Sequence, residues 1–166
     1  MNRAMLLATC VAVLAIASPA QATTGGSVRG GGSGTFPATF GPIAGDRLHI
    51  EITATTLPNG TVHGAFQMLH RHLDGSTAAE MHGVVTCLRV TGTQASVSGT
   101  ITGGKVTEAP GFDPAGQTFA VTIVDGATGD AAGLDLSFFG GPHTVPACEQ
   151  VPTYLAIDEG AFSVTA

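Results

Sequence analysis

The chain has 166 residues, of which 11% are charged, and its formal net charge is −6. Six Lys and Arg residues are too few to form a basic surface, so the composition argues against nucleic acid or anionic lipid as a partner. The length suits a single domain with its own hydrophobic core.

The first 22 residues have the pattern of a secretory signal peptide. Arg3 is followed by an apolar run over residues 5–17, and the sequence SPAQA at residues 18–22 matches the small-x-small rule for cleavage. We predict cleavage after Ala22. No later segment is long and apolar enough to span a membrane, so residues 23–166 are expected to be secreted.

A lipoprotein signal is the alternative for this N-terminus. Cys10 would then carry a lipid and tether the chain to the membrane. This interpretation leaves a very short apolar segment before Cys10 and places the unfavourable Thr9 at the cleavage position.

Removal of residues 1–22 takes Arg3 from the six basic residues, leaving five against 12 Asp and Glu, a net charge of −7.

Two cysteines, Cys87 and Cys148, remain after the predicted cleavage. An even pair in an oxidising extracellular setting is most simply one disulfide. The bond would close a loop of about 60 residues and contribute about 4 kcal/mol at most on the chain-entropy model. Two free thiols are the alternative. Ligation of a metal by both is disfavoured because the sequence has no C-x-x-C pair.

Residues 23–34 follow the predicted signal directly and are rich in glycine. Six of these 12 residues are Gly. Such a stretch has too few apolar side chains to order itself by burial. We predict a flexible arm, or a loose lead into the first strand.

Residues 35–166 are predicted to form one β domain. The longest run without Gly or Pro is 12 residues, 46–57, which leaves no room for a long helix. Apolar and polar residues alternate with period two in several segments: 48–53, 62–68, 81–90, 97–101, 119–123, 134–138 and 162–164. Turn sequences such as Asn59-Gly60 separate them. The pattern predicts a single antiparallel β-sandwich or flattened barrel of about eight or nine strands.

Three segments carry a family resemblance: HGVVTCLRVTGTQASVSGTI at residues 82–101, FAVTIVDG at 119–126 and GAFSV at 160–164. Together they resemble small secreted actinobacterial β proteins, similar to the domain that follows choice-of-anchor segments in bacterial surface proteins. The resemblance implies an exported β domain with no catalytic residues to transfer. Thr93 departs from the family's Asn, and Asn is missing before Gly126, which weakens both turn signals.

Four of the six histidines fall between residues 63 and 82. A hairpin that pairs His70 with His82 and His72 with Glu80 would place these side chains on one face. Two or three imidazoles and a carboxylate can bind zinc or copper, so these four residues are the candidate metal ligands. The alternative is the solvated tip of a hairpin, because a one-residue shift would separate the pairs.

Catalytic motifs are not evident elsewhere in the sequence. Residues 31–35 (GGSGT) lack the last glycine of the G-x-S-x-G nucleophile motif. Asp125, Asp130 and Asp135 lie near glycines, which fits turns better than a calcium loop. Alternating Ser and Thr from Ser96 to Thr102 are expected to face solvent. We predict no catalytic residues and no cofactor beyond the metal considered above.

Three functions remain open from the sequence. The first is a non-enzymatic extracellular module, associated with the cell surface or binding an unidentified partner through loops or a sheet face. The second is a carrier whose sheet closes around an apolar cavity for a small ligand. The third is a metal-binding protein or metal-dependent hydrolase using His70, His72 and His82. Export and the few titratable side chains favour the first.

Overall fold

The computed structural model describes residues 25–166, so the predicted signal peptide at residues 1–22 lies outside the described residues. Nine strands are present: β1 (Ser27–Thr35), β2 (Arg47–Thr56), β3 (Val62–Arg71), β4 (Thr77–Thr91), β5 (Gln94–Val106), β6 (Thr118–Val124), β7 (Ala131–Leu136), β8 (Leu155–Ala156) and β9 (Glu159–Thr165). A 3-10 helix, η1 (Ala38–Ile43), joins β1 to β2. No helix in the described part of the chain is long and apolar enough to cross a membrane.

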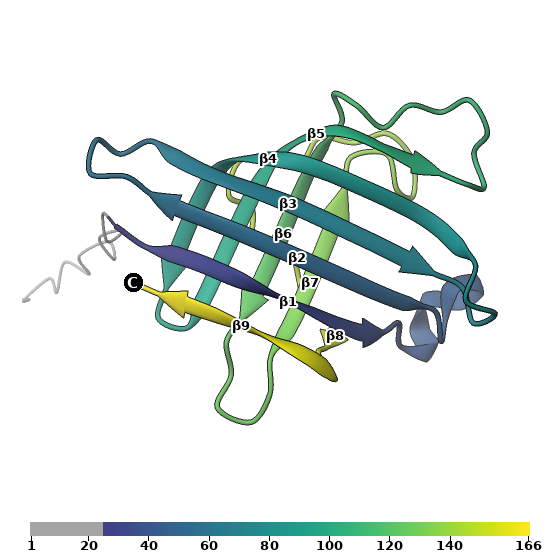
Figure 1. The fold of residues 1–166 in the computed structure, drawn as a ribbon, viewed down its shortest axis with the longest axis horizontal. Coiled ribbons are helices and arrows are strands. Elements are labelled where there is room, and N and C mark those ends of the chain that lie inside the picture. Colours follow the sequence, from purple (N-terminus) through teal and green to yellow (C-terminus); the bar gives the residue numbers. More distant parts are fainter. Residues whose placement is uncertain (1–24) are drawn as a thin grey trace, which may run out of the picture.

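All nine strands belong to one antiparallel sheet, which confirms the predicted all-β fold. Strands β1 to β8 pair in chain order, and β9 returns to pair with the free side of β1, so the order is β8-β7-β6-β5-β4-β3-β2-β1-β9. The sheet is curled into a half-barrel, with β9, β1, β2 and β3 in one layer and β5, β6 and β7 crossing behind it (Figure 1).

The long strand β4 carries the chain from one layer to the other. Its pairing with β5 shifts register between His82 and Gly83 and again between Val85 and Cys87. Such irregularities bend a strand and increase its twist. The β4 ribbon therefore runs beside β3 at one end and bends over toward the crossing strands at the other (Figure 1).

The hydrophobic core lies between the two layers. Phe66 of β3 stacks on Phe119 of β6 with 4.2 Å between the ring centroids, and neither side chain is exposed. Inward-facing aliphatic residues surround this pair, among them Leu48, Ile50, Ile52, Val97, Ile101, Val121 and Ile123. Their burial follows the alternation seen in the sequence, because successive strand residues point to opposite faces.

The glycine-rich segment after the predicted signal forms a strand over most of its length. The prediction of a flexible arm at residues 23–34 is wrong for Ser27 onward, because β1 pairs with β2 on one side and with β9 on the other. Backbone hydrogen bonds on both sides order a segment that has few apolar side chains. The absence of side chains also allows close packing, since a Cβ on Gly34 would collide with the Ala156 carbonyl oxygen and the Leu155 side chain.

The outer face of β5 and β6 is covered by the long connection between β7 and β8. Cys148 in this connection forms the predicted disulfide with Cys87 of β4. The Cys148 N–H donates to Oγ of Ser98 at 2.9 Å, and the Val151 N–H donates to Oγ1 of Thr122 at 2.8 Å. Ser98 is therefore 5% exposed, and the prediction that it faces solvent is wrong because a loop distant in sequence covers it.

Two carboxylates accept hydrogen bonds from backbone N–H groups on the edge of β9 that does not pair with β1. The Phe162 N–H donates to Oδ2 of Asp130 at 2.6 Å, and the Val164 N–H donates to Oδ2 of Asp125 at 3.0 Å. Both aspartates flank the turn between β6 and β7, where the sequence predicted turn residues. They link the last strand of one layer to the hairpin of the other, so side chains hold the curled sheet together where strands do not pair.

We expect Gly34→Ala to lower the free energy of unfolding by about 1–3 kcal/mol, because the new methyl group would force β1 and β8 apart. Gly31→Ala is the matched control in the same strand. Its Cβ would come no closer than 3.4 Å to a neighbouring atom, the Ile50 carbonyl oxygen. Urea unfolding of the two variants measures the difference, and an equal loss in both would contradict the packing argument.

Replacing Asp130 with alanine is expected to cost about 1–3 kcal/mol of unfolding free energy, because the Phe162 N–H loses a charged acceptor. The same replacement at the exposed Glu149 provides the control. Urea unfolding again gives the energy, and amide hydrogen exchange at Phe162 should accelerate in Asp130→Ala alone. Unchanged exchange would show that Asp130 does not protect β9.

Candidate functional site

An apolar cavity of about 150 Å³ lies between the two layers at the end of the molecule where β1 leads into η1. Its walls come from β2, β3, β4, β7, the end of β5 and the connections around these strands. Aromatic rings form much of the lining: Phe36, Phe40, Phe138, Phe139 and Tyr154. The core is therefore incompletely filled at this end, although it is closely packed around Phe66.

The aromatic wall is held by contacts among three rings. The centroids of Phe40 and Tyr154 are 4.5 Å apart, and those of Phe36 and Phe40 are 5.3 Å apart. The Tyr154 hydroxyl donates to the Leu134 carbonyl at 3.0 Å and accepts from the Leu134 N–H at 3.3 Å. Burial raises the pKa of Tyr154 to about 12, so the hydroxyl stays neutral. Tyr154 presents an apolar ring to the cavity because its polar end is engaged by β7.

His70 is a polar side chain in this lining. It follows Phe66 and Met68 on the inner face of β3, and its ring meets Phe36 edge-on with 5.2 Å between the centroids. Its Nε2 atom lies 2.9 Å from Oδ2 of Asp46. His70 therefore connects the apolar cavity to a buried carboxylate.

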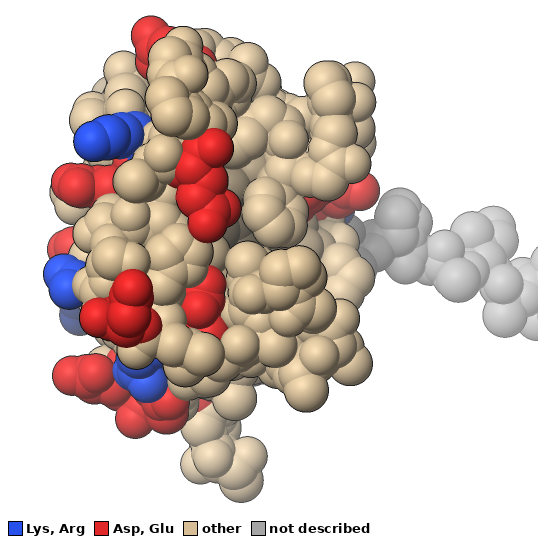
Figure 2. Space-filling view, turned by 90° about the vertical axis from the view of Figure 1, so that its right-hand side faces the viewer, with Lys and Arg blue, Asp and Glu red and all other residues tan. Residues whose placement is uncertain are grey.

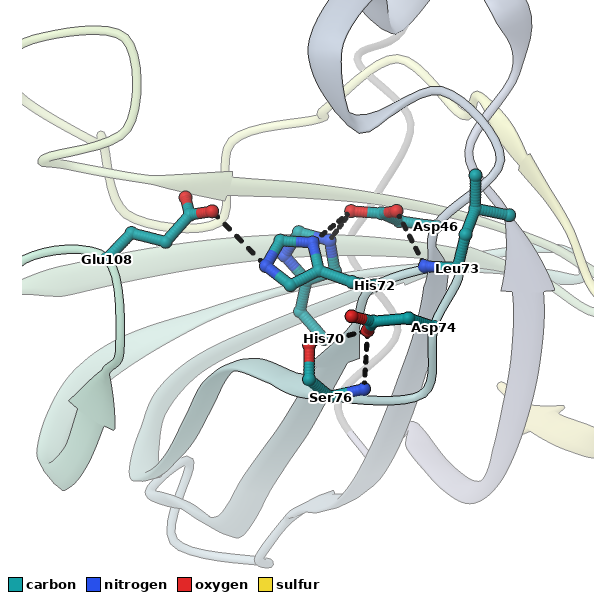
Figure 3. Close-up of polar contacts among 7 residues, drawn as sticks. All are labelled: Asp46, His70, His72, Leu73, Asp74, Ser76 and Glu108. Carbon is teal, nitrogen blue, oxygen red and sulfur yellow. Dashed lines mark hydrogen bonds and ion pairs between the residues drawn. The ribbon is translucent and has the colours of Figure 1, made fainter.

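Asp46 is 4% exposed and lies between η1 and β2. Its Oδ2 atom contacts Nε2 of His70 and, at 3.0 Å, Nδ1 of His72, while Oδ1 accepts a hydrogen bond from the Leu73 N–H at 3.2 Å (Figure 3). Both carboxylate oxygens are thus satisfied by the end of β3 and the turn that follows. This contact holds the connection between β1 and β2, which carries part of the aromatic wall, in place against β3.

The charges of the cluster stabilise one another. Burial by itself raises the pKa of the Asp46 carboxyl, but hydrogen bonds with His72 and His70 and the charges of both rings outweigh it, so the pKa lies below its usual value of 3.8. The hydrogen bond to Asp46 raises the pKa of His72, aided by the negative charges of Asp46, Glu108 and Asp74 and opposed by desolvation. Asp46 is therefore a carboxylate at neutral pH and accepts hydrogen bonds from the imidazoles.

Asp46, His70 and His72 offer ligand atoms that all lie within 4.8 Å of one another, so this cluster is where a metal ion could be held. The two oxygen-to-nitrogen distances, 2.9 and 3.0 Å, are those of hydrogen bonds. Ligand atoms around a tetrahedral zinc, with bonds of about 2.0–2.1 Å, lie roughly 3.3 Å apart. Hydrogen bonding accounts for the observed geometry, and zinc or copper binding stays a prediction.

The four predicted metal ligands are divided between the two faces of the sheet. β3 and β4 pair Gln67 with His82 and Leu69 with Glu80, so His82 and Glu80 are exposed on the outer face, opposite to His70. The assumed pairing of His70 with His82 is wrong. The observed register buries Phe66 and Met68 of β3 together with Ala79 and Met81 of β4, and burial of one face selects register.

Sequence reasoning missed Asp46, although a signal for it was present. Asp46 is in phase with Leu48, Ile50 and Ile52, the inward-facing residues of β2. An acidic residue that continues an apolar face needs a partner when it is buried. The in-phase position of His70 on the neighbouring strand could have suggested that partner.

We expect the contribution of His72 to stability to depend on pH. Because its pKa is raised by folding, the contribution is fully present below the unfolded pKa of 6.5 and is lost as pH rises through the folded pKa. The lowered pKa of Asp46 makes its contribution present above 3.8 and lost as pH falls through the folded value. The unfolding free energy of the wild type minus that of His72→Gln should thus be largest between roughly pH 4 and 6.5.

Urea unfolding at a series of pH values measures this difference, and the same replacement at the exposed His63 is the control. The difference for His72→Gln should shrink from about pH 6 to about pH 9. A difference that grows over this range would show that the interaction with Asp46 does not favour protonated His72.

Comparison of the chain with protein-family models, with curated proteins and with solved structures finds no match in any of the three. The resemblance to exported bacterial β proteins therefore stays a prediction. Any function has to be argued from the cavity and from the side chains around it.

Proposed function

We propose that this protein binds a small apolar molecule in the cavity beside η1 and serves as its carrier or receptor outside the cell. The observation that carries the proposal is the cavity itself, with a volume of about 150 Å³ and a lining of aromatic and aliphatic side chains. A cavity of about this volume lined by apolar residues can bind a molecule the size of benzene. Burial of apolar surface would supply most of the binding free energy.

The exposure of Phe139 supports access to the cavity from solvent. Phe139 lines the cavity and is 57% exposed, so it lies at the boundary between the interior and the surface. Figure 2 looks onto the end of the molecule that carries η1, where uncharged side chains form most of the surface. An apolar molecule that reaches this end meets an apolar side chain before it enters.

Binding is favoured over catalysis by the state of the polar groups around the cavity. The Tyr154 hydroxyl is engaged by Leu134, and both oxygens of Asp46 are engaged by protein donors. The hydrolase considered from the sequence requires His82 beside His70, which the strand register does not allow. A metal-free binding site is the simpler function for this geometry.

The extracellular location is part of the proposal. Residues 1–22 have the pattern of a cleaved signal, and the Cys87–Cys148 disulfide is compatible with an oxidising environment. The sequence resemblance to exported β proteins points the same way. A carrier or receptor for small apolar molecules is a function suited to that location, because such molecules are poorly soluble in water.

The experiment is titration of the purified protein, without the predicted signal peptide, with toluene followed by NMR. We expect a dissociation constant of about 0.1–1 mM, with shifts confined to the cavity-lining residues. Ala79→Leu should abolish binding because Ala79 faces the cavity and the larger side chain would fill it. Val84→Leu is the control on the outer face of the same strand, where the side chain is 47% exposed.

Circular dichroism checks that both variants are folded. The proposal fails if the wild type shows no saturable binding, or if Ala79→Leu and Val84→Leu bind toluene equally well.

A further inference from the structure

One ring nitrogen of His70 is not used by the protein. The hydrogen bond of His70 to Asp46 is made through Nε2, and within residues 25–166 no hydrogen bond reaches Nδ1. Every fully buried side-chain nitrogen or oxygen in these residues has a hydrogen-bond partner. Nδ1 of His70 has none, so it is not fully buried. His70 lines the cavity, so a molecule bound there lies beside the ring that carries Nδ1.

The hydrogen bond between Nε2 of His70 and Asp46 determines whether Nδ1 can donate or accept a hydrogen bond. Asp46 is a carboxylate and can only accept, so Nε2 of His70 carries the proton of that hydrogen bond. When the ring of His70 is neutral, its other nitrogen, Nδ1, has a free lone pair and acts as an acceptor. In this form of His70, an otherwise apolar, aromatic wall carries one hydrogen-bond acceptor.

The charges at this end of the molecule disfavour an anion. Glu108 lines the cavity and lies 3.2 Å from Nε2 of His72, and the buried Asp46 lies behind His70. Red acidic side chains also cover more of the surface seen in Figure 2 than blue Lys and Arg side chains do. A carboxylate ligand would meet two negative charges and, at Nδ1 of the neutral ring, an acceptor that cannot bind it.

We propose that the cavity is specific for a small neutral phenol, whose ring packs against Phe36 and Phe40 and whose hydroxyl donates to Nδ1 of His70. This inference rests on the proposed function, because it assigns a ligand class to the same cavity. The ring contributes apolar burial and aromatic contacts, and the hydroxyl fixes the orientation. An apolar site with one placed polar group discriminates ligands by that group.

Two matched variants separate the roles of the ring nitrogens. In His70→Gln the side-chain amide can replace Nε2 as the donor to Asp46, but nothing replaces Nδ1. In His72→Asn the amide can replace Nδ1 as the donor to Asp46, and the contact with Glu108 is lost. The first variant removes the proposed anchor, while the second perturbs the same cluster and leaves the anchor in place.

The experiment measures the affinities of phenol, toluene and benzoate for the wild type and both variants by NMR titration. The ratio of phenol to toluene affinity should fall about tenfold in His70→Gln, while remaining within about twofold of wild type in His72→Asn. Benzoate should bind more weakly than phenol in every case. Toluene binding should change little, because it does not use Nδ1.

A second measurement does not depend on how the variants fold. In wild-type protein labelled with ¹⁵N-histidine, phenol should shift the Nδ1 resonance of His70, and toluene should leave it near its position in the free protein.

An unchanged phenol-to-toluene ratio in His70→Gln, an equal loss in His72→Asn, or tighter binding of benzoate than phenol would overturn the inference. In those cases toluene binding would still support an apolar site. Failure of all three ligands to bind would overturn the proposed function together with the inference.

Discussion

A curled sheet must satisfy the backbone groups along its two free edges, and the rest of this structure depends on how that is done. The edge of β9 is satisfied by the carboxylates of Asp125 and Asp130, which come from the hairpin of the opposite layer. The short β8 reaches β7 on one side and lies against Gly34 of β1 on the other. These contacts keep the two layers together although β8 and β9, the two ends of the sheet, do not pair with each other. The half-barrel therefore encloses its core.

The same closure accounts for the position of the cavity. In the middle of the sheet, Phe66 and Phe119 stack and fill the space between the layers. At the η1 end, the wall is made of aromatic residues from connections, and the Asp46 carboxylate holds one of these connections on β3. Because this wall of the cavity is made of loops, it leaves a space that hydrogen-bonded strands would have closed. The apolar cavity and the position of His70 in its lining are thus consequences of how the sheet ends.

Alternation of apolar and polar residues was sufficient to predict the strand content and the inner face of most strands. In the structure this alternation continues from Phe66 and Met68 to His70 on the inner face of β3. The pairing of His70 was not predictable in the same way, because register depends on which residues of both strands are buried together. The glycines of β1 look disordered in isolation, since their role depends on β8 and β9, more than 100 residues later in the chain. Asp46 was missed for a related reason: its partners lie on another hairpin.

The sequence by itself determined an all-β chain of about eight or nine strands and the disulfide between Cys87 and Cys148, because these follow from local periodicity and cysteine count. The signal segment is a prediction from N-terminal composition. Tertiary structure decided which histidines meet, and it joined His70 and His72 to Asp46 while leaving His82 on the outer face. It also decided that a cavity exists. The physical reason is that register, edge closure and loop packing are settled by burial between distant segments, which local sequence patterns do not specify.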